Sequence, residues 1–124
     1  MIEYLLNYGV KKHNVEYEDL DVNDRLALQD QINKSRKDYF QLLSLLDEIQ
    51  FKFLECNKNI NERTKELLTK NEGTRNNILS NDDVYLTLDA ELQALKTAMS
   101  MINEQIDFCK SDLRILNSVF YNKF

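Results

Sequence analysis

The sequence predicts an all-α protein: a long helix-loop-helix hairpin that oligomerises into a helical bundle or ring. Apolar residues recur every 3.5 residues on average over two long stretches, Pro is absent, and Gly occurs only twice in 124 residues. This period keeps one side of a helix on a partner helix, whereas a strand repeats its apolar positions every second residue. We therefore expect a short N-terminal helix and arm over 1–22 and a hairpin over 23–124, made of a helix over 24–70, a turn over 71–81 and a helix over 82–121.

The helix over 82–121 carries the purer seam, since none of its a and d positions is charged when Tyr85 is taken as position a. A second apolar stripe follows its c and g positions through Ala94, Ala98, Met101, Phe108, Ile115 and Val119. Such a helix either touches a second neighbour or turns both stripes to one core. We expect a homo-oligomer, with an interface formed by Leu92, Leu95, Met99, Ile102, Ile106, Phe108, Leu113, Leu116 and Phe120.

The helix over 24–70 has a less regular seam, because Arg25, Ser35 and Arg63 share the a and d register with its apolar residues. Arg63 is expected either to extend out of the seam or to face an opening. Cys56 and Cys109 both occupy d positions, where a small apolar residue is expected. The hairpin places them about 20 Å apart along the axis, which excludes a disulfide between them.

Capping residues are expected at both helix starts. Asp21 or Asn23 would cap the first long helix. Ser80 and Asp83 would form a capping box at the second. The acidic residues near position 21 also resemble a calcium loop, but its sixth place, which needs Gly, holds Asp24, so helix capping is the preferred interpretation.

The overall charge limits the functions to consider. A net charge of −5 argues against wholesale wrapping of nucleic acid, which requires many Lys and Arg. The N-terminus has no basic segment ahead of an apolar run, and no apolar stretch approaches about 20 residues. We expect a soluble, cytoplasmic protein without a membrane span.

No catalytic constellation is evident. The sequence has one His, no Trp, no Gly-rich phosphate loop and no Cys-x-x-Cys pair. Its carboxylates have basic neighbours three or four residues away, which is typical of a charged helix surface. We expect neither enzymatic activity nor a cofactor or metal.

One basic cluster could bind a ligand at the loop end of the hairpin. Against three Glu it has five basic members, Lys58, Arg63, Lys65, Lys70 and Arg75. A solvated helix surface explains such a surplus equally well. In an oligomer, however, the cluster would be repeated by every subunit and form a positive band.

Three motifs resemble the UvsY-type recombination mediators of large tailed bacteriophages. The acidic turn of that family corresponds here to Leu79-Ser80-Asn81-Asp82-Asp83, and its Leu-rich helix start to Tyr85-Leu86-Thr87-Leu88. Its aromatic helix middle corresponds to Ile106-Asp107-Phe108-Cys109. The family's basic pair before the turn corresponds to Arg63-Thr64-Lys65. The resemblance covers about residues 24–121 and is clearest over 78–120.

The resemblance implies a small helical homo-oligomer that binds single-stranded DNA and helps a recombinase displace single-strand-binding protein, in the cytoplasm of the host bacterium. Arg63 and Lys65 would then contact DNA. The acidic net charge and the absence of aromatic residues in Glu66-Leu67-Leu68 depart from a base-stacking surface. A helical adaptor or structural subunit that binds only protein is the alternative function.

Overall fold

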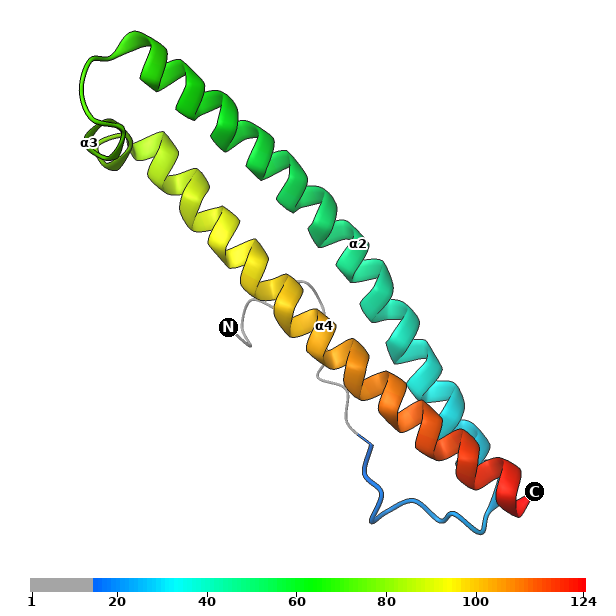
Figure 1. Cartoon of the computed structure of the whole chain (residues 1–124). Coiled ribbons are helices and arrows are strands. Elements are labelled where there is room, and N and C mark those ends of the chain that lie inside the picture. The colour runs from blue at the N-terminus through cyan, green and yellow to red at the C-terminus, as the bar shows by residue number, and fades with distance from the viewer. Residues whose placement is uncertain (1–14) are drawn as a thin grey trace. The chain divides into compact units, whose positions relative to one another are not determined.

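The computed structural model describes residues 15–124, which form three helices and no strand (Figure 1). These are α2 (Arg25–Lys70), α3 (Arg75–Ser80) and α4 (Asp83–Lys123). Both long helices begin one residue later than predicted, and α4 ends two residues later. The all-α class and the pairing of two long helices are confirmed. No helix among the described residues is both long and apolar enough to cross a membrane.

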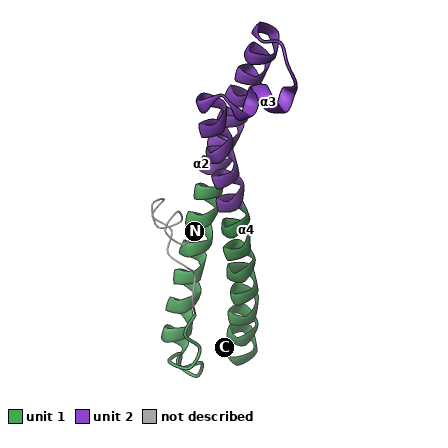
Figure 2. Cartoon of the chain, turned by 90° about the vertical axis from the view of Figure 1, so that its left-hand side faces the viewer, with its two compact units in different colours: residues 1–46, 100–124 green, residues 47–99 purple. Residues whose placement is uncertain are grey.

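The chain divides into two units, and α2 and α4 each contribute a segment to both (Figure 2). Unit 1 holds residues 1–46 and 100–124, and unit 2 holds residues 47–99. In each unit the two segments run antiparallel, so that later residues of α2 contact earlier residues of α4. Arg25 lies over the Phe120 ring in unit 1, and the Cys56 thiol meets the Leu88 carbonyl in unit 2.

The core of unit 1 is centred on Leu28, Ile32 and Leu116, which are at most 2% exposed. Further along the seam Ser35 and Cys109 are completely buried. Ser35 is tolerated there because its hydroxyl accepts a hydrogen bond from the Gln31 amide, 3.1 Å away. The heptad seam predicted from sequence is therefore the buried face of both helix segments.

The core of unit 2 follows the same seam and adds one residue from the connection. Ile60 of α2 and Leu92 and Leu95 of α4 are buried, as is Leu79 of α3. The short helix α3 thus has its own place in the core, although the sequence pattern predicted only a turn there. Its single buried side chain could not produce a detectable period over six residues.

Residues 15–24 of unit 1 are non-helical and include two turns. Val15 is buried, and Leu20 packs against the cluster of Leu28, Ile32 and Leu116. The Tyr17 hydroxyl donates a hydrogen bond to Asp112, and burial, followed by this bond, raises the pKa of Tyr17. The predicted short N-terminal helix, which is expected to end at Gly9, lies outside the described residues, as does the first part of the predicted arm.

The cap of α2 is Asp24, so the prediction of Asp21 or Asn23 is wrong. The Asp24 carboxylate accepts hydrogen bonds from the backbone N–H groups of Leu26 and Ala27, at 3.0 and 3.3 Å. Asp21 instead accepts from the Asn23 N–H within the preceding turn. Several neighbouring residues had suitable side chains, and only the backbone geometry selects one of them.

The predicted capping box at α4 is also wrong. Asp82 caps the helix by accepting a hydrogen bond from the Tyr85 N–H at 2.8 Å. The Ser80 hydroxyl donates to the Asn77 carbonyl, because Ser80 is the last residue of α3. Between α2 and α3, Gly73 has a φ of +139°, a conformation that disfavours any residue with a Cβ.

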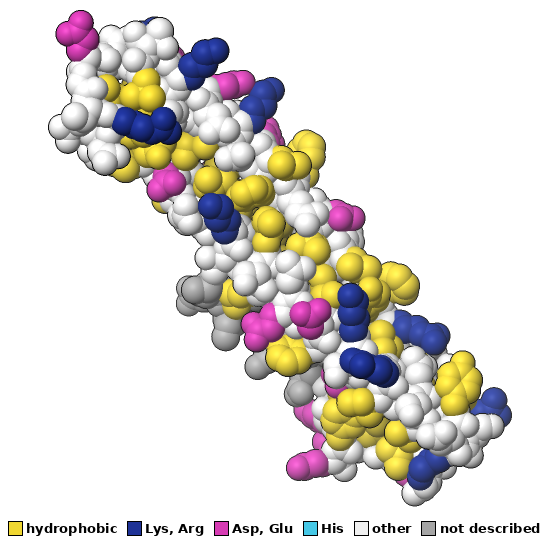
Figure 3. Space-filling view, in the orientation of Figure 1, with side chains coloured by type: hydrophobic (Ala, Val, Ile, Leu, Met, Phe, Trp, Pro, Cys, Tyr) yellow, Lys and Arg dark blue, Asp and Glu magenta, His cyan; other side chains and the backbone are white. Residues whose placement is uncertain are grey.

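Several of the predicted interface residues are buried by the chain itself. Five of them are at most 7% exposed, namely Leu92, Leu95, Ile102, Ile106 and Leu116. Met99, Leu113 and Phe120 are partly buried. Phe108 is 50% exposed and Ile115 is 49% exposed. The two residues are seven apart and therefore lie on the same face of α4. Hydrophobic side chains also appear among the charged ones on the surface shown in Figure 3.

The two cysteines are free and buried. Burial raises the pKa of Cys109 to about 12, with further contributions from the charges of Asp38 and Asp112. Burial and the charges of Glu91 and Asp89 raise the pKa of Cys56 in the same way. Since the thiolate is the reactive form, both side chains are packing residues with suppressed reactivity.

We predict that Cys109 in the folded protein resists modification by a disulfide reagent such as DTNB. A rise in pKa from 9.0 to about 12 lowers the thiolate fraction near neutral pH about 1,000-fold. The C56S variant isolates Cys109, and the same variant in denaturant gives the unperturbed rate. Equal rates in the folded and unfolded protein would contradict the packing role.

Candidate nucleic-acid interface

The five basic residues of the predicted site all lie in unit 2, at the end that contains the connection. Lys58, Arg63, Lys65 and Lys70 belong to α2, and Arg75 is the first residue of α3. Their surroundings differ, and the structure separates them into an outward-facing pair, a seam residue and two residues near the turn.

Lys58 and Lys65 form the outward-facing pair. They are seven residues apart, so they share the f position of the heptad, opposite the seam. Both are exposed, and within residues 15–124 neither takes part in an ion pair. Their ammonium groups are therefore available to an external anion.

Arg63 is held inside the hairpin. Its Nε and Nη2 groups donate to the two carboxylate oxygens of Asp82, at 3.0 and 2.7 Å, and its side chain is 28% exposed. The hydrogen bond raises the pKa of Arg63 and lowers the pKa of Asp82. The sequence left open whether Arg63 extends outward or faces an opening. In fact it binds the residue that caps α4.

Lys70 and Arg75 lie closer to the turn. The Lys70 ammonium donates to Glu66 at 3.0 Å, and Arg63 Nη1 lies 3.7 Å from the same carboxylate. The hydrogen bond and charge of Lys70, then the charge of Arg63, lower the pKa of Glu66. Arg75 is exposed. Of the five residues, Arg63 and Lys70 already have internal anionic partners.

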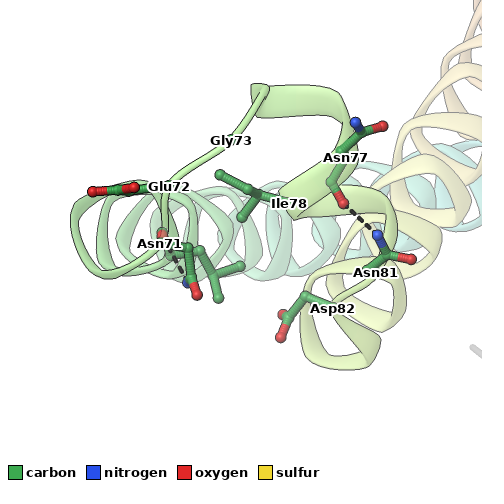
Figure 4. Close-up of a pocket in the computed structure, with 8 residues that line it drawn as sticks. Asn71, Glu72, Gly73, Asn77, Ile78, Asn81 and Asp82 are labelled. Atoms are coloured by element: carbon green, nitrogen blue, oxygen red, sulfur yellow. Dashed lines mark hydrogen bonds between the residues drawn. The ribbon is translucent and has the colours of Figure 1, made fainter.

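An open cavity of about 460 Å³ lies beside these residues, between the end of α2 and α3 (Figure 4). Leu67 and Ile78 provide its apolar surface, and Ile78 points into it from α3. The amides of Asn71 and Asn81 hold its walls by donating to the carbonyls of Leu67 and Asn77, at 2.9 and 2.7 Å. Asp82 completes the lining, so the cavity adjoins the Arg63 ion pair.

Sequence reasoning missed the role of Asp82. One indication was present: Arg63 occupies a seam position, where a cation needs an anionic partner on the facing helix. In an antiparallel hairpin the residues facing Arg63 come from the acidic start of the second helix. Asp82 and Asp83 were both candidates, and only the coordinates distinguish them.

We predict that D82N lowers the free energy of unfolding at pH 7, because the neutral amide loses the ion pair with Arg63. The pKa of Asp82 is depressed from 3.8 in the folded state, so the stabilisation is present above pH 3.8 and is lost as the pH falls below that value. The difference between wild type and D82N should therefore shrink in acid. Urea unfolding across this pH range measures it.

D83N is the matched control, since it removes the same charge from the next residue, which is exposed. It should leave the pH dependence of unfolding close to that of the wild type. Identical pH profiles for D82N and the wild type would show that the ion pair contributes nothing to stability.

Comparison with known protein families, with curated proteins and with solved structures finds no match for this chain. Function is therefore inferred from the sequence motifs and from the geometry of residues 15–124.

Proposed function

We propose that this protein is a helical homo-oligomer that binds single-stranded DNA and assists the loading of a recombinase onto it. The observation that carries the proposal is the pair of exposed lysines, Lys58 and Lys65, on the outer line of α2. The motifs that resemble those of UvsY-type mediators, including Arg63-Thr64-Lys65, agree with a phosphate-binding role for this part of the helix.

The geometry suits contact with a DNA backbone. Seven residues of helix separate the two ammonium-bearing positions by about 10 Å along the axis. Each lysine can neutralise a phosphate, and neutralisation releases counterions without reading the base sequence. Two cations per chain give weak binding, so an assembly that repeats the pair is needed for avidity.

The exposed apolar residues of unit 1 support assembly. Phe108 and Ile115 are about half exposed and occupy successive c positions of the α4 heptads. Met101, at the preceding c position, is partly buried. Fully burying an exposed side chain of this size is favourable by about 1.5–3 kcal/mol, so burying the exposed half of each against a second copy contributes about half of that. A homo-oligomer held through this face would repeat Lys58 and Lys65 in every subunit.

A protein-only adaptor is the second candidate function, and a separate observation favours it. Phe51 and Leu54 of unit 2 are 69% and 65% exposed, on the same helix as the lysines. Residues three apart are neighbours on a helix surface, and contiguous exposed apolar patches mark protein-binding surfaces. In that case Lys58 would lie at the edge of a protein-binding surface instead of binding phosphate.

We predict that K58Q/K65Q weakens binding to a fluorescein-labelled oligodeoxythymidylate and flattens its salt dependence. Loss of two phosphate contacts should reduce the slope of log K against log salt by about 1.4, at about 0.7 per contact on single strands. Fluorescence anisotropy at low and physiological salt gives both quantities.

The matched control is K37Q/K110Q, which removes two exposed lysines from unit 1. It should bind nearly as the wild type does. If correctly folded wild-type protein binds no DNA even at low salt, the adaptor function is favoured instead.

We also predict that the protein is an oligomer at micromolar concentration and that F108E/I115E lowers its mass. Both side chains are half exposed in the single chain, so charge at these positions should break contacts between chains and leave the hairpin folded. Light scattering gives the mass, and circular dichroism checks the helices.

N103E/S118E places the same two charges on other exposed positions of α4 and should keep the wild-type mass. A monomeric wild-type protein would refute the assembly proposed here.

A further inference from the structure

Arg63 is engaged in a contact that resembles the way arginine binds phosphate. Two of its N–H groups point in parallel at two oxygens of one anion, Asp82, at 3.0 and 2.7 Å. Carboxylate and phosphate both accept this two-pronged contact from a guanidinium group. Asp82 therefore occupies the position on Arg63 that a phosphate would take.

The local charges balance while this contact is made. Arg63 is paired with Asp82 and Glu66, and Lys70 is paired with Glu66, each pair within 4 Å. Two cations and two anions give no net attraction for phosphate. The Arg63 side chain is nevertheless 28% exposed, so it is not sealed off from solvent.

Asp82 can release Arg63 without losing its structural role. Its carboxylate also accepts the Tyr85 N–H at 2.8 Å, which caps α4. Capping needs an oxygen acceptor and no charge, and Asn caps helices about as well as Asp. The charge of Asp82 is thus separable from its function at the helix start.

We propose that Asp82 is an internal competitor of nucleic-acid phosphate for Arg63. In the free protein Asp82 holds Arg63, and a backbone phosphate displaces the carboxylate when a strand binds at this end of unit 2. This inference rests on the proposed function and identifies the residue that limits its affinity. Arg63 then adds one phosphate contact to those of the outward-facing lysines.

The test compares D82N with D83N. Each variant removes one negative charge from adjacent positions, but only Asp82 is paired with Arg63. By anisotropy with the same labelled oligodeoxythymidylate, D82N should bind about two- to fivefold more tightly than D83N at low salt, the factor typical of one exposed ion pair. Its salt slope should stay close to that of D83N, because Arg63 contacts a phosphate in both complexes and only the cost of displacing Asp82 differs.

A double-mutant comparison identifies the source of the gain. R63Q/D82N should bind no more tightly than R63Q, because the residue released by the loss of Asp82 is then absent. A gain that persists in R63Q/D82N would show that general charge removal, and not release of Arg63, causes it.

The outcomes separate this inference from the proposed function. If wild-type protein binds and D82N binds no better than D83N, the inference is wrong and the proposed function stands. Binding by D82N with none by the wild type would show that Asp82 blocks Arg63, but it would contradict displacement of the carboxylate by phosphate and DNA binding by the native chain. Absence of binding by both would overturn both.

Discussion

The structure depends on the mutual burial of two narrow apolar seams. The apolar side chains of each seam lie on one side of a helix, and they are removed from water only where another helix packs on them. Within each unit the seam of α2 meets that of α4, which buries Leu28 and Leu116 in one and Ile60 and Leu95 in the other. The chain must therefore reverse between the helices, and Gly73 and α3 provide the reversal.

Arg63 shows how this constraint affects an ionisable side chain. A cation at a seam position loses water, and the two hydrogen bonds from Asp82 compensate for part of that loss. Asp82 in turn caps α4, so one carboxylate serves the helix start and the facing helix together. If Arg63 binds phosphate as proposed, this arrangement connects the stability of the turn to the number of cations available for binding.

The features proposed to carry function lie on the faces that the seams do not use. Lys58 and Lys65 point away from the partner helix, and Phe108 and Ile115 lie on a flank of α4. Because these residues contribute little to the core, they are free to bind other molecules. The same reasoning applies to Phe51 and Leu54, and it keeps a protein-only adaptor as the competing function.

The class of fold and the extent of both long helices follow from local pattern, since a 3.5-residue apolar period and the absence of Pro act on neighbouring residues alone. The basic residues of the candidate site were also recognisable from sequence. Their separate environments were not, because the partner of Arg63 lies 19 residues away on another element. Which of several adjacent polar residues caps each helix, Asp24 and Asp82 here, likewise depends on backbone geometry that no local preference specifies. Burial of Ile102 and Ile106 by the chain's own helices, with exposure of Phe108, depends on the rotation of each helix about its axis, which is set by packing between distant segments.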